Sequence, residues 1–170
     1  MHYVILVLAT LLRLIPHPYN VTPIASIGLF AGTWCDKRIA WLIPLIPLFI
    51  GDAISGFYNP LIMAFVYLGI ALSAVIGRWM LATRRSFTRF GSAVFINALI
   101  FYLLTNFPVW LVYYPNTLAG LAECYIKGIP YFGYSLVGDS LFTTLIFGLH
   151  YLAMQASQRH GSEVSHQRQA

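Results

Sequence analysis

The 170-residue chain is 59% hydrophobic and only 9% charged, and its mean hydropathy is +0.73. Soluble domains carry roughly 25% charged residues, so this composition excludes an ordinary soluble domain. The formal net charge of +5 comes from Lys and Arg in short clusters between apolar runs. That pattern is typical of the cytoplasmic loops of membrane proteins. We therefore expect the lipid bilayer as a partner and no nucleic acid.

Six apolar segments follow one another along the chain, and each membrane crossing needs roughly 20 apolar residues. We predict helices over residues 1–15, 21–34, 39–57, 60–81, 91–107 and 136–155. Pro16 and Pro18 end the first of these, and Pro23 opens the second. The predicted fold class is all-α: a polytopic six-helix membrane domain over residues 1–157, followed by a polar cytoplasmic tail over residues 158–170. We expect the tail to be disordered.

The connector between the last two predicted helices, residues 108–133, is long, aromatic and nearly uncharged. Within it, Asn116 is a suitable cap for a short helix over residues 117–127, and Gly128 and Pro130 are typical helix stops. Apolar residues recur there at helical spacing, at positions 118, 121, 122, 125 and 126. We therefore predict a short amphipathic helix over the mouth of the bundle. Glu123 and Lys127 stand four residues apart, in the order that favours an ion pair.

The orientation follows from the basic residues, because six crossings place 8 of the 10 on one face of the membrane. These eight are Lys37, Arg38, Arg78, Arg84, Arg85, Arg89, Arg159 and Arg168. The positive-inside rule then puts both termini in the cytoplasm. Tyrosines gather instead at the outer connectors: Tyr19, Tyr58, Tyr113, Tyr114, Tyr125, Tyr131 and Tyr134. Aromatic belts explain this asymmetry, and a stacking pocket for a ring-containing ligand is the alternative.

Small residues recur at the spacing that lets helix backbones approach. They are Gly28 and Gly32 in one predicted helix, and Gly69, Ser73 and Gly77 in another. Packing within the bundle is the default interpretation, and a surface for docking a partner is the alternative.

Two aspartates, Asp52 and Asp139, lie inside predicted helices at a similar depth in the outer half of the membrane, each directly after a glycine. A carboxylate at the centre of a membrane helix costs roughly 2.5–3.5 kcal/mol and usually faces a partner or a water-filled cavity. Arg13 is the obvious candidate partner. A structural ion pair with Arg13 and a substrate-binding site are both open at this point.

Further polar residues gather at the same outer level and predict a polar cavity open to the outside. The candidate substrate-binding residues are Arg13, His17, Asn20, Asp52, Asn106, Glu123 and Asp139. No Ser-His-Asp grouping, HExxH motif, phosphate loop or C-x-x-C pair occurs, so we predict no enzyme, no metal site and no resident cofactor. Cys35 and Cys124 fall on opposite membrane faces, too far apart for a disulfide. Cys124 is then a small buried hydrophobe or, alternatively, a soft ligand for a metal-containing substrate.

Several segments together resemble a bacterial family of small membrane proteins known only as a domain of unknown function. They read RLIPHPYN followed by VTPIA at residues 13–25, TNFPVW at 105–110, YPNTL at 114–118, and Gly138-Asp139. The resemblance implies a multi-pass protein of the bacterial cytoplasmic (inner) membrane and no known activity.

More distantly, the layout is similar to the S components of energy-coupling-factor vitamin transporters, six-helix proteins with cytoplasmic termini and a ligand site near the outer face. This likeness implies a substrate-binding or uptake subunit for a small micronutrient, with an energising transporter module as a further partner. The first predicted helix has Ala9 but lacks the Ala-x-x-x-Ala row on which S components dock that module. The alternatives are a non-transport assembly or scaffold protein and, third, an intramembrane enzyme.

Overall fold

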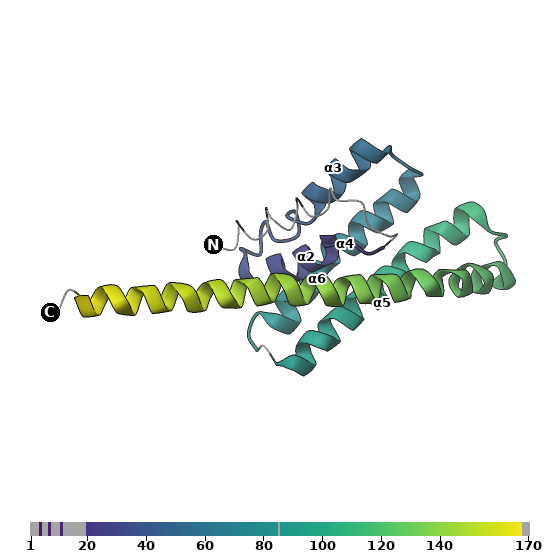
Figure 1. Ribbon diagram of the computed structural model, residues 1–170. Coiled ribbons are helices and arrows are strands. Elements are labelled where there is room, and N and C mark those ends of the chain that lie inside the picture. The colour runs from purple at the N-terminus through teal and green to yellow at the C-terminus, as the bar shows by residue number, and fades with distance from the viewer. Residues whose placement is uncertain (1–3, 5–6, 8–10, 12–19, 85, 168–170) are drawn as a thin grey trace.

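The computed structural model describes residues 20–84 and 86–167, together with positions 4, 7 and 11. The part of the chain in the two long ranges is all-helical, which confirms the predicted class (Figure 1). Its helices are α2 (Ile24–Trp34), α3 (Leu45–Ser55), α4 (Pro60–Leu81), α5 (Phe87–Tyr113) and α6 (Leu118–Gln167). The predicted first helix, residues 1–15, lies outside the described residues apart from those three positions.

Within the described ranges, three helices are long and apolar enough to cross a membrane: α4, α5, and α6 over residues 118–158. This finding indicates a membrane protein. Helices α2 and α3 are apolar but have only 11 residues each, about 16 Å at 1.5 Å per residue. They are shorter than the roughly 30 Å hydrocarbon core of a bilayer. Six crossings therefore remain a prediction.

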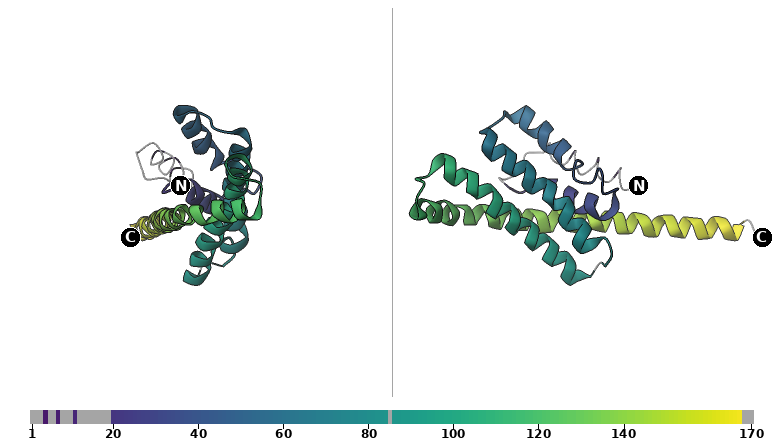
Figure 2. Two further views of the ribbon diagram at one scale, coloured as in Figure 1. Left: turned by 90° about the vertical axis from the view of Figure 1, so that its right-hand side faces the viewer. Right: turned by 180° about the vertical axis from the view of Figure 1, so that it is seen from behind.

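Helix α2 lies at the centre of the bundle. Every residue from Ile24 to Thr33 is buried, as expected for a helix that is apolar on all sides. Helices α4 and α6 pack directly against it, α5 packs against α4 and α6, and α3 contacts α2 and α4. Figure 2 shows that the C-terminal part of α6 extends well beyond the other helices.

Glycines allow the backbones of α2 and α4 to approach closely. A Cβ added at Gly32 would lie 1.9 Å from the carbonyl oxygen of Ala74, and one added at Gly77 would lie 2.1 Å from that of Leu29. The hydroxyl of Thr33 donates across the same crossing to the Gly77 carbonyl, at 3.3 Å. The expected packing role of these small residues is confirmed.

Helix α4 begins and ends at the predicted residues because its start signals are local. The side chain of Asn59 accepts hydrogen bonds from the amides of Leu61, at 3.0 Å, and Ile62, at 3.3 Å. Pro60 occupies the first turn, where its missing N–H costs nothing. Helix α3 instead begins at Leu45, six residues after the predicted start, with Pro44 as its N-cap.

The predicted short amphipathic helix is not a separate element, because α6 continues through Gly128 and Pro130. A Cβ at Gly128 would lie 2.5 Å from Asn106 Oδ1, so this glycine allows α6 to pack against α5 instead of ending a helix. Prolines within membrane helices are tolerated where neighbouring groups satisfy the freed backbone. The predicted apolar face does not pack onto the bundle at Leu118 and Ile126, which are 84% and 64% exposed.

Other helix boundaries also differ from prediction: α2 begins at Ile24 instead of residue 21, and α5 begins at Phe87 instead of residue 91. Helix α5 does not end at residue 107 but runs through Pro108 to Tyr113. Helix α6 reaches Gln167, so residues 158–167 are helical where the sequence favoured disorder. The division into a membrane domain and a cytoplasmic tail at residue 157 stays a prediction.

Candidate functional site

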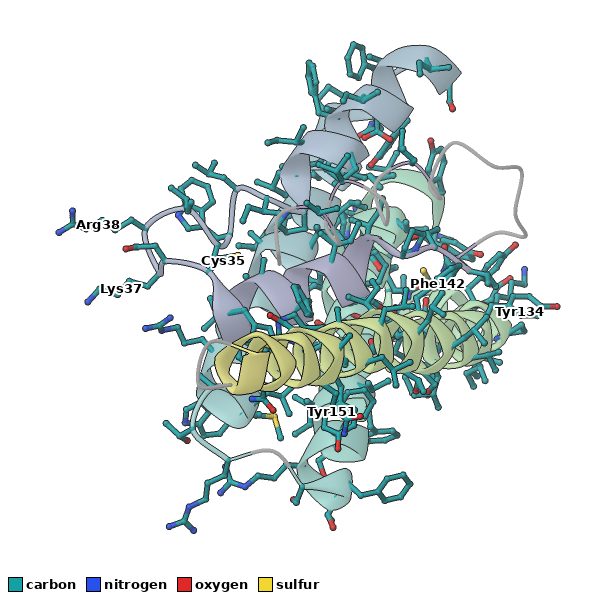
Figure 3. All side chains as sticks on the ribbon, turned by 60° about the vertical axis from the view of Figure 1, so that its left-hand side comes forward. Cys35, Lys37, Arg38, Tyr134, Phe142 and Tyr151 are labelled. Atoms are coloured by element: carbon teal, nitrogen blue, oxygen red, sulfur yellow. The ribbon has the colours of Figure 1, made fainter. Side chains whose placement is uncertain are left out.

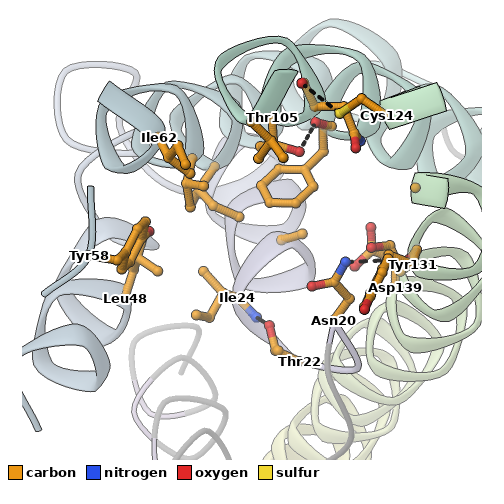
Figure 4. A pocket seen from close by; sticks show the side chains of 18 of the residues that line it. Asn20, Thr22, Ile24, Leu48, Tyr58, Ile62, Thr105, Cys124, Tyr131 and Asp139 are labelled. Atoms are coloured by element: carbon orange, nitrogen blue, oxygen red, sulfur yellow. Dashed lines mark hydrogen bonds between the residues drawn. The ribbon is translucent and has the colours of Figure 1, made fainter. Parts of the chain in front are cut away.

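A cavity of about 620 Å³ opens at the end of the bundle where α2 begins. All five described helices and residues 20–22 contribute to its walls. Leu48, Tyr58 and Ile62 lie on one side, and Tyr131 and Asp139 lie on the other (Figure 4). The volume falls within the range of about 300–1,000 Å³ that is typical of small-molecule sites.

Four of the seven candidate residues predicted from the sequence line this cavity: Asn20, Asp52, Asn106 and Asp139. Glu123 is not part of its wall, although its partner Lys127 is. Arg13 and His17 lie outside the described residues, so the suggested ion pair of Arg13 with an aspartate stays a prediction. The structure thus gathers residues from four separate parts of the chain, while their role in binding remains a prediction.

Asp52 enters the cavity wall from the last turns of α3. The residue is only 8% exposed. Its Oδ2 accepts a hydrogen bond of 3.0 Å from the hydroxyl of Tyr67 on α4. This contact links two neighbouring helices through an uncharged donor.

Asp139 enters the opposite wall from α6 and is 4% exposed. Its Oδ2 accepts a hydrogen bond of 3.1 Å from the side-chain amide of Asn97 on α5. The main-chain carbonyl of Asp139 accepts a bond of 3.3 Å from Ser26 of α2, and Thr143 donates to the Ser26 hydroxyl at 2.8 Å. A buried polar network therefore joins three helices at the base of this wall.

One polar atom of the Asn97 side chain, Oδ1, is buried without a hydrogen-bond partner among the described residues. The residue is 2% exposed. Buried polar atoms are nearly always paired in folded proteins. This oxygen lies on the side chain that holds Asp139, and it marks a polar site that the described residues leave incomplete.

Gly138 brings the start of the described chain against α6 beside Asp139. A Cβ there would lie 2.9 Å from the Cα of Val21, so only glycine allows this approach. Asn20 adopts a φ of 61°, a left-handed conformation that asparagine tolerates better than most residues. Its side-chain amide donates to the carbonyl of Tyr131 at 3.4 Å. These contacts hold Asn20 at the rim of the cavity.

Lys127 is a cation of the cavity wall that the candidate set did not include. Its Nζ lies 2.6 Å from Glu123 Oε1, which confirms the expected pair at a spacing of four residues. The same Nζ lies 5.6 Å from the ring centre of Tyr114. Among the described residues this is the only ion pair found. The ammonium group therefore already has its own counter-charge.

Cys124 also lines the cavity and is 2% exposed. Its thiol lies 3.5 Å from the carbonyl oxygen of Asn106, at the contact between α5 and α6. Both cysteines are free. In the described ranges, no three side chains of the usual metal-binding types come together.

The cavity lies at the end of the bundle opposite to the basic clusters. The guanidinium of Arg78 donates to the carbonyl of Cys35 at 3.4 Å, which places the end of α4 beside the end of α2. Lys37 and Arg38 follow directly and point away from the bundle, on the opposite side of the view from Tyr134 (Figure 3). The cavity surrounds the other ends of these helices, where α2 and α4 begin.

Comparison with curated proteins finds no match, and comparison with solved structures finds none either. The likeness to S components therefore stays a prediction. A family model matches residues 1–162, which include every residue that lines the cavity. The chain belongs to the family of unknown function DUF6580.

Proposed function

We propose that this chain is a membrane substrate-binding or uptake subunit for a small, water-soluble micronutrient. The cavity carries this proposal, because it has the volume of a ligand site and holds two buried carboxylates on different helices. Protein interiors are close-packed, and burying a carboxylate is costly unless it has a partner. A bundle that served only as a scaffold would need neither the open volume nor these buried carboxyl groups.

The proposal includes a topology of six crossings with both termini in the cytoplasm of a bacterial cell. The positive-inside rule places the end with Lys37, Arg38 and Arg78 in the cytoplasm. The cavity then opens to the outside, where a nutrient would arrive. An energising transporter module is the proposed partner at the inner face.

The scaffold alternative receives less support from the packing of α2. The scaffold alternative was suggested by the rows of small residues. Gly28, Gly32 and Gly77 of these rows lie at the contact between α2 and α4. These rows are therefore not available to a partner. The proposal also assigns a binding role and no catalysis.

The test is whether the purified protein retains or recovers a small molecule through the two aspartates. Native mass spectrometry of detergent-purified protein should detect a bound molecule. A low-molecular-weight cell extract should raise the unfolding temperature, because a ligand that binds only the folded state stabilises it. Both effects should disappear in the Asp52→Asn, Asp139→Asn double variant.

Asp36→Asn is the matched control. Asp36 is an exposed carboxylate at the other end of the bundle, where it accepts a hydrogen bond of 2.8 Å from the Arg38 amide. This variant should keep both the bound molecule and the stabilisation. Full ligand effects in the double aspartate variant would contradict the proposed site. No bound molecule, together with robust co-purification of another membrane protein, would favour the scaffold alternative.

A further inference from the structure

The described part of the cavity wall holds more carboxyl than amino side chains. Among its described residues only Asp52, Asp139 and Lys127 have a carboxyl or amino side chain. The Lys127 ammonium is paired with Glu123 at 2.6 Å. The carboxyl groups of Asp52 and Asp139 therefore have no cation of the described wall as a partner.

The hydrogen-bond partners of the two aspartates are both neutral. Asp52 accepts from the Tyr67 hydroxyl, and Asp139 accepts from the Asn97 amide. An ionised carboxylate has about four acceptor positions, so each retains capacity for further donors. The buried Asn97 Oδ1 adds an acceptor that is unpartnered among the described residues, directly beside Asp139. A positively charged donor in the cavity would satisfy free acceptor positions of the carboxyl group that it faces.

Aromatic rings line the same space. Tyr58 and Tyr131 stand on opposite walls of the cavity (Figure 4), and Tyr114 and Phe101 also line it. The faces of such rings attract cations and stack against flat groups. The rings and the carboxylates thus favour the same kind of ligand.

We propose, building on the function proposed above, that the cavity binds a small organic cation that carries a flat ring. Its protonated nitrogen faces Asp139 in the cavity wall, and its ring lies among the tyrosines. The alternative is that Arg13 of the same chain supplies the positive charge that pairs with an aspartate. The ligand would then need no positive charge.

A matched set of probes separates these arrangements: 1-naphthylmethylammonium, the neutral 1-naphthalenemethanol and the anionic 1-naphthoate. Affinities for the purified protein are measured by thermal shift and by displacement of the co-purified molecule in native mass spectra. We expect the cation to bind about tenfold more tightly, or better, than either analogue, because charge-assisted hydrogen bonds are about twice as strong as neutral ones. Asp139→Asn should remove this preference, and Asp36→Asn should preserve it.

Three outcomes overturn the inference: equal affinity for the three probes, tighter binding of the anion, or no binding of the cation. If the cell extract still stabilises the protein in those cases, the function as a binding subunit stands and only the ligand class is wrong. If neither extract nor probe has any effect, the proposed function fails as well. A loss of stability in Arg13→Ala that is restored by adding Asp139→Asn would identify the internal ion pair.

Discussion

The crossing of α2 and α4 can be tested by adding a single methyl group at Gly32. The new Cβ would lie 1.9 Å from the carbonyl oxygen of Ala74 and 2.7 Å from its carbonyl carbon. Alanine gains about 0.5–1 kcal/mol over glycine in a helix, but overpacking a close contact costs about 1–3 kcal/mol or more. Because the clash is with backbone, the upper part of that cost applies. We expect Gly32→Ala to lose at least about 1 kcal/mol, or about 2–4 °C in Tm.

The assay is thermal unfolding of the detergent-purified protein. Gly91→Ala is the matched control, since Gly91 is also a helical glycine, in α5, but a Cβ there has no atom within 4 Å. This variant should unfold at the same temperature or up to a few degrees higher, through helix propensity alone. The comparison separates the effect of the crossing from the general effect of removing a glycine.

Second-site changes sharpen the test. At Gly28, the added Cβ would meet the side chain of Ser73, with Oγ at 1.6 Å and Cβ at 2.9 Å. Ser73→Gly removes both atoms and should therefore recover much of the stability lost in Gly28→Ala. Ala74→Gly removes none of the backbone atoms that meet Gly32, so it should not rescue Gly32→Ala. An unaltered Tm in Gly32→Ala, or its rescue by Ala74→Gly, would refute the close crossing.

Two further predictions concern orientation and the continuity of α6. A membrane-impermeant thiol reagent applied to intact cells should label Asn116→Cys and spare Ser157→Cys, in a background without native cysteines; the reverse pattern would overturn the topology. Pro130→Ala should leave Tm unchanged or raise it, because alanine supplies the missing N–H to a helix that already continues through this position. A fall of several degrees in Tm would show instead that the proline bounds a separate helix.

The sequence predicts α4 well and α6 poorly, and the reason is the range of the forces involved. Asn59 and Pro60 start α4 through contacts within the first turn, so neighbouring residues carry all the information. At Gly128 and Pro130 the neighbouring residues likewise predict the end of a helix. The helix continues instead, and Gly128 packs against Asn106 on α5. Buried Gly120, Cys124 and Gly128 recur every four residues, and this spacing is the signal that could have revealed the contact with α5.

For the candidate site, the sequence reveals which side chains cost free energy to bury in a membrane helix, but not which residues they contact. Asp52 and Asp139 stand out because a carboxyl group in an apolar helix usually faces a partner or a water-filled cavity. Their partners Tyr67 and Asn97 could not be chosen from the sequence, since the choice depends on how each helix is rotated about its axis. The same holds for Lys127, whose place in the wall follows from the extension of α6 through its predicted end.

The central position of α2 has a consequence for biogenesis. This helix is too short to span the bilayer alone, and it carries the hydroxyl of Ser26 into the interior. The acceptor for that hydroxyl, the Asp139 carbonyl, and its donor, Thr143, both belong to α6, which is synthesised after the other described helices. Until α6 is synthesised, Ser26 lacks these two hydrogen-bond partners, and the side of α2 that packs against α6 has no neighbour there. The packing of α2 seen in the structure can therefore form only after translation has passed residue 143.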